Sequence, residues 1–196
     1  MIRAKEQDRA NKVLNQIDAK LNVLRHHPET SGLFLYLNAN KLGITLNIKN
    51  PTGQKILKDL LKDADVFVEN NSPKLMKKWG LDYARLKKIN SRLILTSITP
   101  FGQTGPYQDY KAYAINCCAA GGVSQITGHF WREPLMTPVS LGHYQAAISG
   151  AGATMVALLA RDVTGRGQQV DISEAEVWAT FHVGFGVTKY TGGAGD

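Results

Sequence analysis

Cysteines are scarce in this sequence, and none of them forms a metal-binding or disulfide pattern. The two that occur, Cys117 and Cys118, are adjacent and cannot readily close an ordinary disulfide with each other. The sequence holds no CxxC pair and no Cys/His spacing typical of zinc sites. We therefore expect no metal, and two small buried thiols in a reducing compartment, which favours a cytoplasmic location.

Long apolar runs, internal repeats and low-complexity segments are missing as well. Without an apolar run of membrane-spanning length, the pattern predicts a soluble chain with no membrane partner. At 196 residues, 43% of them hydrophobic, the chain is long enough for one sizeable core or two small ones.

The net charge of +7 is spread along the chain. Lysines alternate with aspartates over residues 55–88, as on solvated helix faces. Because no nucleic-acid-binding motif accompanies the charge, we expect no nucleic-acid partner. A phosphorylated small molecule would account for the charge equally well.

The loop over residues 99–114 is the most distinctive stretch of the sequence. It follows residues 93–98, an apolar run whose β-branched content predicts a buried strand. Two prolines and two glycines follow within seven positions: Pro100, Gly102, Gly105 and Pro106. This density excludes both helix and strand. Since open α/β sheets bind ligands at the carboxyl ends of their strands, we expect a site here.

Strand and helix signals alternate along the chain, which predicts an α/β fold with a parallel sheet and right-handed crossovers. The expected helices cover residues 51–64, 74–79, 82–89, 115–122, 144–161 and 173–182, and the expected strands cover residues 44–48, 66–68, 93–98 and 168–172. Asn50 and Pro51 suit the start of the first helix, and Ser173 with Glu176 suits a capping box. We expect the loop after residue 69 to open on the same sheet edge as the loop after residue 99.

We predict three segments along the chain. Residues 1–30 form an N-terminal helical segment, because their apolar positions recur at helical spacing. Residues 31–182 form the α/β domain, and residues 183–196 form a Gly-rich tail.

Five short motifs point to a known family. They are Asn38-Ala-Asn-Lys41, Ala64-Asp-Val-Phe-Val-Glu-Asn70, Trp79-Gly-Leu81, Phe101-Gly-Gln-Thr-Gly-Pro-Tyr107 and Arg161-Asp-Val-Thr-Gly-Arg-Gly-Gln168. In this order and spacing, they resemble the family III CoA-transferases, which include carnitine-type CoA-transferases, formyl-CoA transferase and α-methylacyl-CoA racemase. The resemblance runs from about Leu37 to Trp178. It implies a Rossmann-like large domain, the start of a smaller second domain, an interlocked dimer, and coenzyme A bound at the strand ends.

The resemblance also implies which residues line the coenzyme A site. By position these are Lys41, Asn70, Asn71, Lys78 and Lys111. Lysines suit this role because the nucleotide end of coenzyme A carries a 3′-phosphate and a diphosphate. For Lys78 and Lys111, a solvated surface amine is the alternative.

The catalytic positions depart from the family. Its nucleophilic carboxylate, which attacks the acyl-CoA carbonyl and passes through a mixed anhydride and an enzyme–CoA thioester, is replaced by His143. An imidazole forms an acyl-imidazole instead, or acts as a base. The family's second acid corresponds to Ala114, and the racemase pair corresponds to Tyr113 and His143. Asp109 and Glu133 are the acids considered as replacements.

Three functions stay open at this point. The first is a CoA-transferase moving CoA between an acyl-CoA thioester and a carboxylic acid, with impaired or altered catalysis at His143. The second is a non-catalytic, CoA-binding subunit that pairs with an active paralogue. The third is an acyl-CoA racemase or epimerase. Because family members are considerably longer, the resemblance implies a partial chain, working as a homodimer or as a heterodimer with a paralogous subunit.

Overall fold

The computed structural model describes residues 31–129, 131–138 and 141–180. The chain divides between Leu46 and Asn47 into two compact units, which we describe one at a time. The helices are α2 (Gly32–Leu37), α3 (Pro51–Leu61), α4 (Pro73–Trp79), α5 (Tyr83–Ile89), α6 (Ala114–Ala120), α7 (Val123–Ile126), α8 (Leu141–Thr164) and α9 (Glu174–Thr180). The strands are β1 (Val66–Glu69), β2 (Ile94–Thr99) and β3 (Gln169–Ser173).

The described part of the first unit contains α2, which begins after Ser31. The Ser31 hydroxyl accepts a hydrogen bond from Phe34 N (3.3 Å) and so satisfies one of the free N–H groups at the helix start. The strand predicted over residues 44–48 is wrong, because this segment has no regular secondary structure. Its alternating pattern suits a strand, but a strand also needs a neighbour to bond its backbone groups. The segments predicted over residues 1–30 and 183–196 lie outside the described residues.

The second unit is built on a parallel sheet with the strand order β1-β2-β3. Val66 pairs with Ile94 across the first strand pair, and Leu95 pairs with Gln169 across the second. The predicted α/β fold with a parallel sheet is therefore confirmed. The predicted domain boundaries and the start of a second domain stay predictions.

One face of the sheet is covered by α3, α4 and α5. Asn50 caps α3 by accepting a hydrogen bond from Thr52 N (2.8 Å), and Pro51 occupies the first turn, as predicted. Gly80 ends α4 in the left-handed conformation (φ 69°) that glycine adopts without strain. The core of this layer consists of Leu61, Met76, Leu81, Leu86, Leu93 and Leu95.

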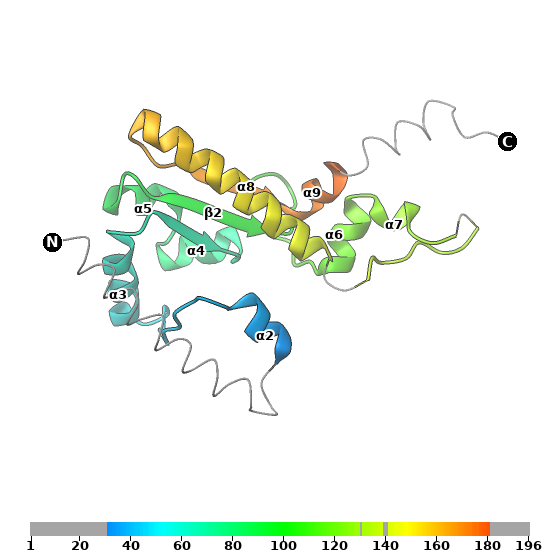
Figure 1. The fold of residues 1–196 in the computed structure, drawn as a ribbon, viewed down its shortest axis with the longest axis horizontal. Helices are drawn as coiled ribbons and strands as arrows, with labels where there is room; N and C mark the ends of the chain where they lie inside the picture. Colours follow the sequence, from blue (N-terminus) through cyan, green and yellow to red (C-terminus); the bar gives the residue numbers. More distant parts are fainter. Residues whose placement is uncertain (1–30, 130, 139–140, 181–196) are drawn as a thin grey trace. The chain divides into compact units, whose positions relative to one another are not determined.

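The other face is covered by α8, which runs along β2 (Figure 1). Its small residues allow close approach: a Cβ on Gly150 would lie 3.1 Å from Ile98 Cδ1. The hydroxyls of Thr96 and Thr154 form a buried hydrogen bond of 2.6 Å between sheet and helix. The sheet-facing side of this helix is therefore closely packed.

The opposite side of α8 is apolar and exposed, through Ile148, Met155, Val156, Leu159 and Val163. By length and composition, α8 is apolar enough to cross a membrane, with a mean hydropathy of 1.3 over its best window. The expectation that no segment meets this criterion is therefore wrong. Alanines and aliphatic residues raise the mean hydropathy of this helix, while glycines and polar residues interrupt any continuous apolar run. Core helices of soluble proteins meet the same criterion, and α8 packs on a sheet.

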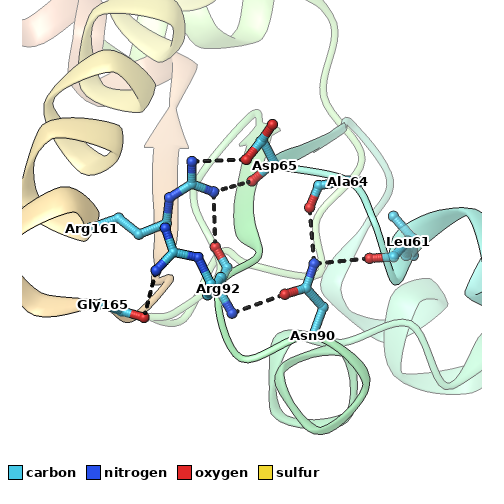
Figure 2. A network of polar contacts seen from close by, with 7 residues as sticks. All are labelled: Leu61, Ala64, Asp65, Asn90, Arg92, Arg161 and Gly165. Carbon is cyan, nitrogen blue, oxygen red and sulfur yellow. Dashed lines mark hydrogen bonds and ion pairs between the residues drawn. The ribbon is translucent and has the colours of Figure 1, made fainter. Parts of the chain in front are cut away.

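A polar network fastens the end of α8 to the starts of β1 and β2 (Figure 2). Arg161 forms an ion pair with Asp65 (2.8 Å) and donates to the main-chain carbonyl of Arg92 (3.2 Å). Asn90 donates to two carbonyls at and just after the end of α3, at 3.1 and 2.9 Å. These contacts fix the amino-terminal edge of the sheet and leave the carboxyl edge free for function.

Candidate active site

The loop that follows β2 is held against β3 and α9. Gln103 N donates to the Asp171 carboxylate (2.9 Å), and Ala175 N donates to the Pro100 carbonyl (3.1 Å). Gly102 has a φ of +81°, and a Cβ there would lie 3.4 Å from the Asp171 carboxylate. The shaped loop expected at this edge is therefore confirmed, and the left-handed backbone at Gly102 favours glycine there, because other residues adopt this conformation only with strain.

The aromatic residues of this loop line a cavity of about 590 Å³. The Phe101 and Tyr107 rings lie 5.8 Å apart, and Tyr110 lies 5.3 Å from Tyr107, which are typical spacings for interacting aromatic rings. Ser173 and Glu176 line the cavity from the side of β3 and α9. The cavity is therefore largely apolar, with one carboxylate at its wall.

A second cavity of about 300 Å³, lined by more charged residues than the first, lies beside the end of β1. Glu69, which lines it, is buried and accepts a hydrogen bond from Asn71 N (2.7 Å). This bond fixes the turn after β1. Gln103, Lys77 and Lys87 also line this cavity.

His143 and Glu174 form a hydrogen-bonded pair at the starts of α8 and α9. His143 Nδ1 lies 2.8 Å from Glu174 Oε2. The His143 side chain is 57% exposed, whereas that of Glu174 is only 6% exposed. Because a carboxylate only accepts hydrogen bonds, the pair requires the imidazole proton on Nδ1. In the neutral tautomer that this contact favours, the second ring nitrogen, Nε2, carries the free lone pair.

Gly142 makes the pairing of the two helix starts possible. A Cβ at this position would overlap Glu174 Oε1 and the indole of Trp178. Beneath the pair lies an apolar cluster of Cys117, Cys118, Val123 and Trp178, packed by Ala112 and Leu141. Burial, with the charge of Glu174, raises the pKa of the Cys117 thiol to about 12. Cys117 is therefore not a nucleophile at neutral pH.

Tyr113, the second predicted catalytic residue, lies at the start of α6. Its backbone N–H donates to the Asn116 side chain (2.9 Å), and its own side chain is 77% exposed. Tyr113 follows Ala112, which packs on the same apolar cluster as Leu141, two residues before His143. The fold thus brings both predicted catalytic segments to one cluster. No hydrogen bond joins Tyr113 to His143 within the described residues, and the catalytic roles of both stay predictions.

The residues predicted to line the coenzyme A site lie on separate elements. Asn70 and Asn71 come directly after β1, Lys78 lies on α4, and Lys111 lies in the loop before α6. All are exposed except Asn71, which is partly buried. Lys41 belongs to the first unit, where its Nζ donates to the Leu37 carbonyl (2.6 Å). The binding role of these residues stays a prediction.

Sequence reasoning missed Glu174. It considered Asp109 and Glu133, both of which are exposed, whereas the acid that meets His143 comes directly after β3. The signal was available, since an acid at the carboxyl end of a parallel strand lies at the ligand-binding edge. The sequence analysis assigned only the neighbouring Ser173 and Glu176, to a capping box, and in the structure the Ser173 hydroxyl does accept a hydrogen bond from Glu176 N (3.3 Å).

No group of three or more acidic, histidine or cysteine side chains is placed to hold a metal ion in the part of the chain that the structure describes. The groups that the structure does place at the edge include an imidazole and a buried carboxylate, His143 and Glu174. This combination suits nucleophilic or general-base attack on a carbonyl group.

Comparison with known protein families gives a match over nearly the whole chain. The model described as CoA-transferase family III matches residues 11–195. Formyl-CoA:oxalate CoA-transferase of Streptomyces avermitilis is 39% identical over 151 residues, which are 76% of this chain and 37% of that protein. The beta subunit of succinyl-CoA–L-malate CoA-transferase of Chloroflexus aurantiacus is 39% identical over 137 residues, which are 67% of this chain and 33% of that protein.

A solved structure supports the fold. The CAIB/BAIF family protein from Brucella suis superposes with a TM-score of 0.73 at 31% identity, covering 78% of this chain and 40% of that one. The chain therefore spans about two fifths or less of the length of these relatives.

Proposed function

Because the chain belongs to CoA-transferase family III, we propose that it acts in the transfer of CoA from an acyl-CoA thioester to a carboxylic acid. The observation that carries the proposal is His143. By the resemblance it occupies the position of the family's catalytic carboxylate, and it lies at the loop-rich edge of the sheet with one nitrogen held by Glu174. Coenzyme A enters as part of the substrate, and the reaction uses no metal.

The sequence relatives suggest which substrates to test. Two of them are named for the pairs formyl-CoA with oxalate and succinyl-CoA with L-malate. Both reactions join a small acyl group to CoA and release a small carboxylate. We propose that this chain takes substrates of the same class, with Lys41, Asn70, Asn71, Lys78 and Lys111 toward the coenzyme.

A second candidate function is a CoA-binding subunit that works with an active paralogue. It is favoured by the absence of the family's carboxylate at His143 and by the relative named as a beta subunit. We also propose that the chain works as a homodimer or as a heterodimer with a paralogous subunit, which the family resemblance implies. The two free buried cysteines are consistent with a cytoplasmic location, which we also propose.

The test is to incubate the chain with formyl-CoA and oxalate, and separately with succinyl-CoA and L-malate. New CoA thioesters are followed by liquid chromatography with mass spectrometry, and covalent adducts by the intact mass of the protein. We expect oxalyl-CoA or malyl-CoA to appear, together with an acyl adduct that maps to His143. His129→Gln serves as a matched control, because this second histidine is also exposed and lies away from the pair.

Two variants separate the candidates. His143→Gln keeps the size of the side chain and should abolish the adduct and the turnover. His143→Asp restores the family's carboxylate. If CoA binds tightly but neither the natural chain nor His143→Asp turns over, the subunit candidate is supported. If no acyl-CoA binds at all, both candidates are wrong.

A further inference from the structure

We propose that Glu174 is the positioning residue for His143, and that it makes Nε2 the atom that attacks the acyl thioester. The proposal rests on the proposed function for its substrate. Its geometry stands by itself: Nδ1 of His143 and Oε2 of Glu174 are 2.8 Å apart. The carboxylate accepts a hydrogen bond from the Nδ1–H group. In the neutral ring this leaves the Nε2 lone pair free.

The difference in exposure between the two side chains distinguishes this pair from a surface ion pair. Lys62 and Asp59 also form a 2.7 Å ion pair, but their side chains are 59% and 51% exposed. Such an exposed ion pair contributes little to the stability of the fold. Glu174, at 6% exposure, is fixed inside the protein, while His143 reaches it from an exposed position. The carboxylate is therefore a rigid support, and the imidazole is the group that substrate can reach.

Several contacts fix Glu174 in place. It is the first residue of α9, where the helix dipole favours a negative charge. The next residue, Ala175, donates its N–H to the Pro100 carbonyl (3.1 Å), which ties this helix start to the loop after β2. Gly142 leaves the room that the carboxylate occupies. A carboxylate buried in this way is costly unless it is paired, and His143 supplies the pairing.

The chemistry balances without a further reagent. The Nε2 lone pair attacks the carbonyl carbon of the acyl thioester, the carbon–sulfur bond breaks, and CoA leaves as its thiolate. The acyl-imidazolium keeps its Nδ1 proton, and the Glu174 carboxylate offsets its positive charge through a charge-assisted hydrogen bond.

The acceptor carboxylate completes the exchange. Its oxygen attacks the acyl carbon, which returns the electron pair to Nε2 and forms a mixed anhydride. The CoA thiolate then attacks the acceptor's carbonyl carbon, and the original acyl group leaves as a carboxylate. His143 thus takes the acyl-accepting part that a carboxylate plays elsewhere in the family.

The experiment measures the nucleophilicity of His143 without CoA, so that it does not depend on the proposed function. The probe is diethyl pyrocarbonate, which acylates unprotonated imidazole nitrogens, and the modified peptides are quantified by mass spectrometry over time near neutral pH. His129 in the same molecule is the internal reference. In the natural chain, we expect His143 to be modified faster than His129.

The decisive variant is Glu174→Gln, which is close in size and removes the charge. Removing the carboxylate partner of a metal-binding histidine typically lowers metal affinity or activity about tenfold or more. We expect the acylation rate of His143 to fall by a factor of that order. Glu176→Gln is the matched control, because Glu176 lies on the same helix and is exposed. It should leave the rate unchanged. Equal acylation of His143 in the natural chain and both variants would overturn the proposal.

A second measurement needs no variant and so does not depend on how a variant folds. Nitrogen-15 NMR of labelled histidine identifies which ring nitrogen carries the proton. The proposal requires the proton on Nδ1 of His143, with Nε2 bare. A proton found on Nε2 in the neutral ring would refute it. If the tautomer and the acylation rates are as expected but no CoA-transfer occurs, the proposed function fails while this inference stands.

Discussion

Replacing Gly142 by alanine tests whether the two helix starts must approach as closely as the structure places them. A Cβ at Gly142 would overlap both Glu174 Oε1 and the indole of Trp178, whose Nε1 would lie 2.5 Å away. The carboxylate is the flexible end of its side chain and can turn away, whereas the indole ring is packed in the apolar cluster. Relief of the overlap therefore displaces Glu174 from His143.

The magnitude follows from two opposing terms. Alanine in place of glycine favours a helix by at most about 1 kcal/mol, and less in the first turn. Overpacking of a tight contact costs about 1–3 kcal/mol. We expect Gly142→Ala to lower the free energy of unfolding by about 1–2 kcal/mol, because the overlap outweighs the helix preference.

Gly152→Ala is the matched control, because Gly152 lies on the same helix and a Cβ there meets nothing within 4 Å. It should raise the free energy of unfolding by up to about 1 kcal/mol. Urea unfolding followed by circular dichroism measures both variants, and diethyl pyrocarbonate labelling should show slower acylation of His143 in Gly142→Ala alone. If the two variants have the same stability and the same His143 reactivity, the close approach of α8 and α9 is not as described.

Three further expectations concern stability and thiol chemistry. Arg161→Met should lower the free energy of unfolding in urea by about 3 kcal/mol, because it removes two charged hydrogen bonds from the buried Arg161 side chain to the Asp65 and Arg92 carbonyls. Asp65→Asn should lower it by under about 1 kcal/mol, since the Asp65 side chain is 75% exposed; equal losses would contradict the structure. Asn90→Ala should lower the free energy of unfolding by about 2 kcal/mol in the same assay, because two carbonyls lose their hydrogen-bond donor. An unchanged urea midpoint would show that Asn90 does not stabilise this part of the fold. Cys117, whose pKa is raised from 9.0 to about 12, should hold about a thousandfold less thiolate than an ordinary cysteine at about pH 8. Iodoacetamide should therefore label it far more slowly in the folded chain than in urea, and equal rates would refute the burial. The contribution of the protonated Cys117 thiol to the free energy of unfolding is complete below about pH 9 and is lost as the pH rises toward 12.

Local chemistry in the sequence was sufficient to predict most of the framework. Asn50-Pro51 starts α3 as expected, Gly80 separates α4 from α5, and the β-branched run before residue 99 forms the central strand. In each case the decisive interaction lies within a few residues of the pattern that predicts it. The family resemblance likewise rests on short motifs, and the match over residues 11–195 confirms it.

Partners distant in sequence account for what could not be predicted. The alternation over residues 44–48 is typical of a strand, yet it pairs with no strand in the described part of the chain and stays irregular. The helix after residue 141 is apolar on both sides, and only the packed structure distinguishes its sheet-facing side from its exposed side.

The candidate site shows the same division. The sequence was sufficient to predict that glycines and prolines shape the loop after the central strand and that the strands end at one edge, and the family resemblance predicts that His143 stands where the family has a carboxylate. It could not determine that Glu174, thirty-one residues further along the chain, holds that histidine. That contact depends on the room left by Gly142 and on the packing of α8 and α9 over one apolar cluster. Such an arrangement is set by the sum of the tertiary contacts, and no local pattern encodes it.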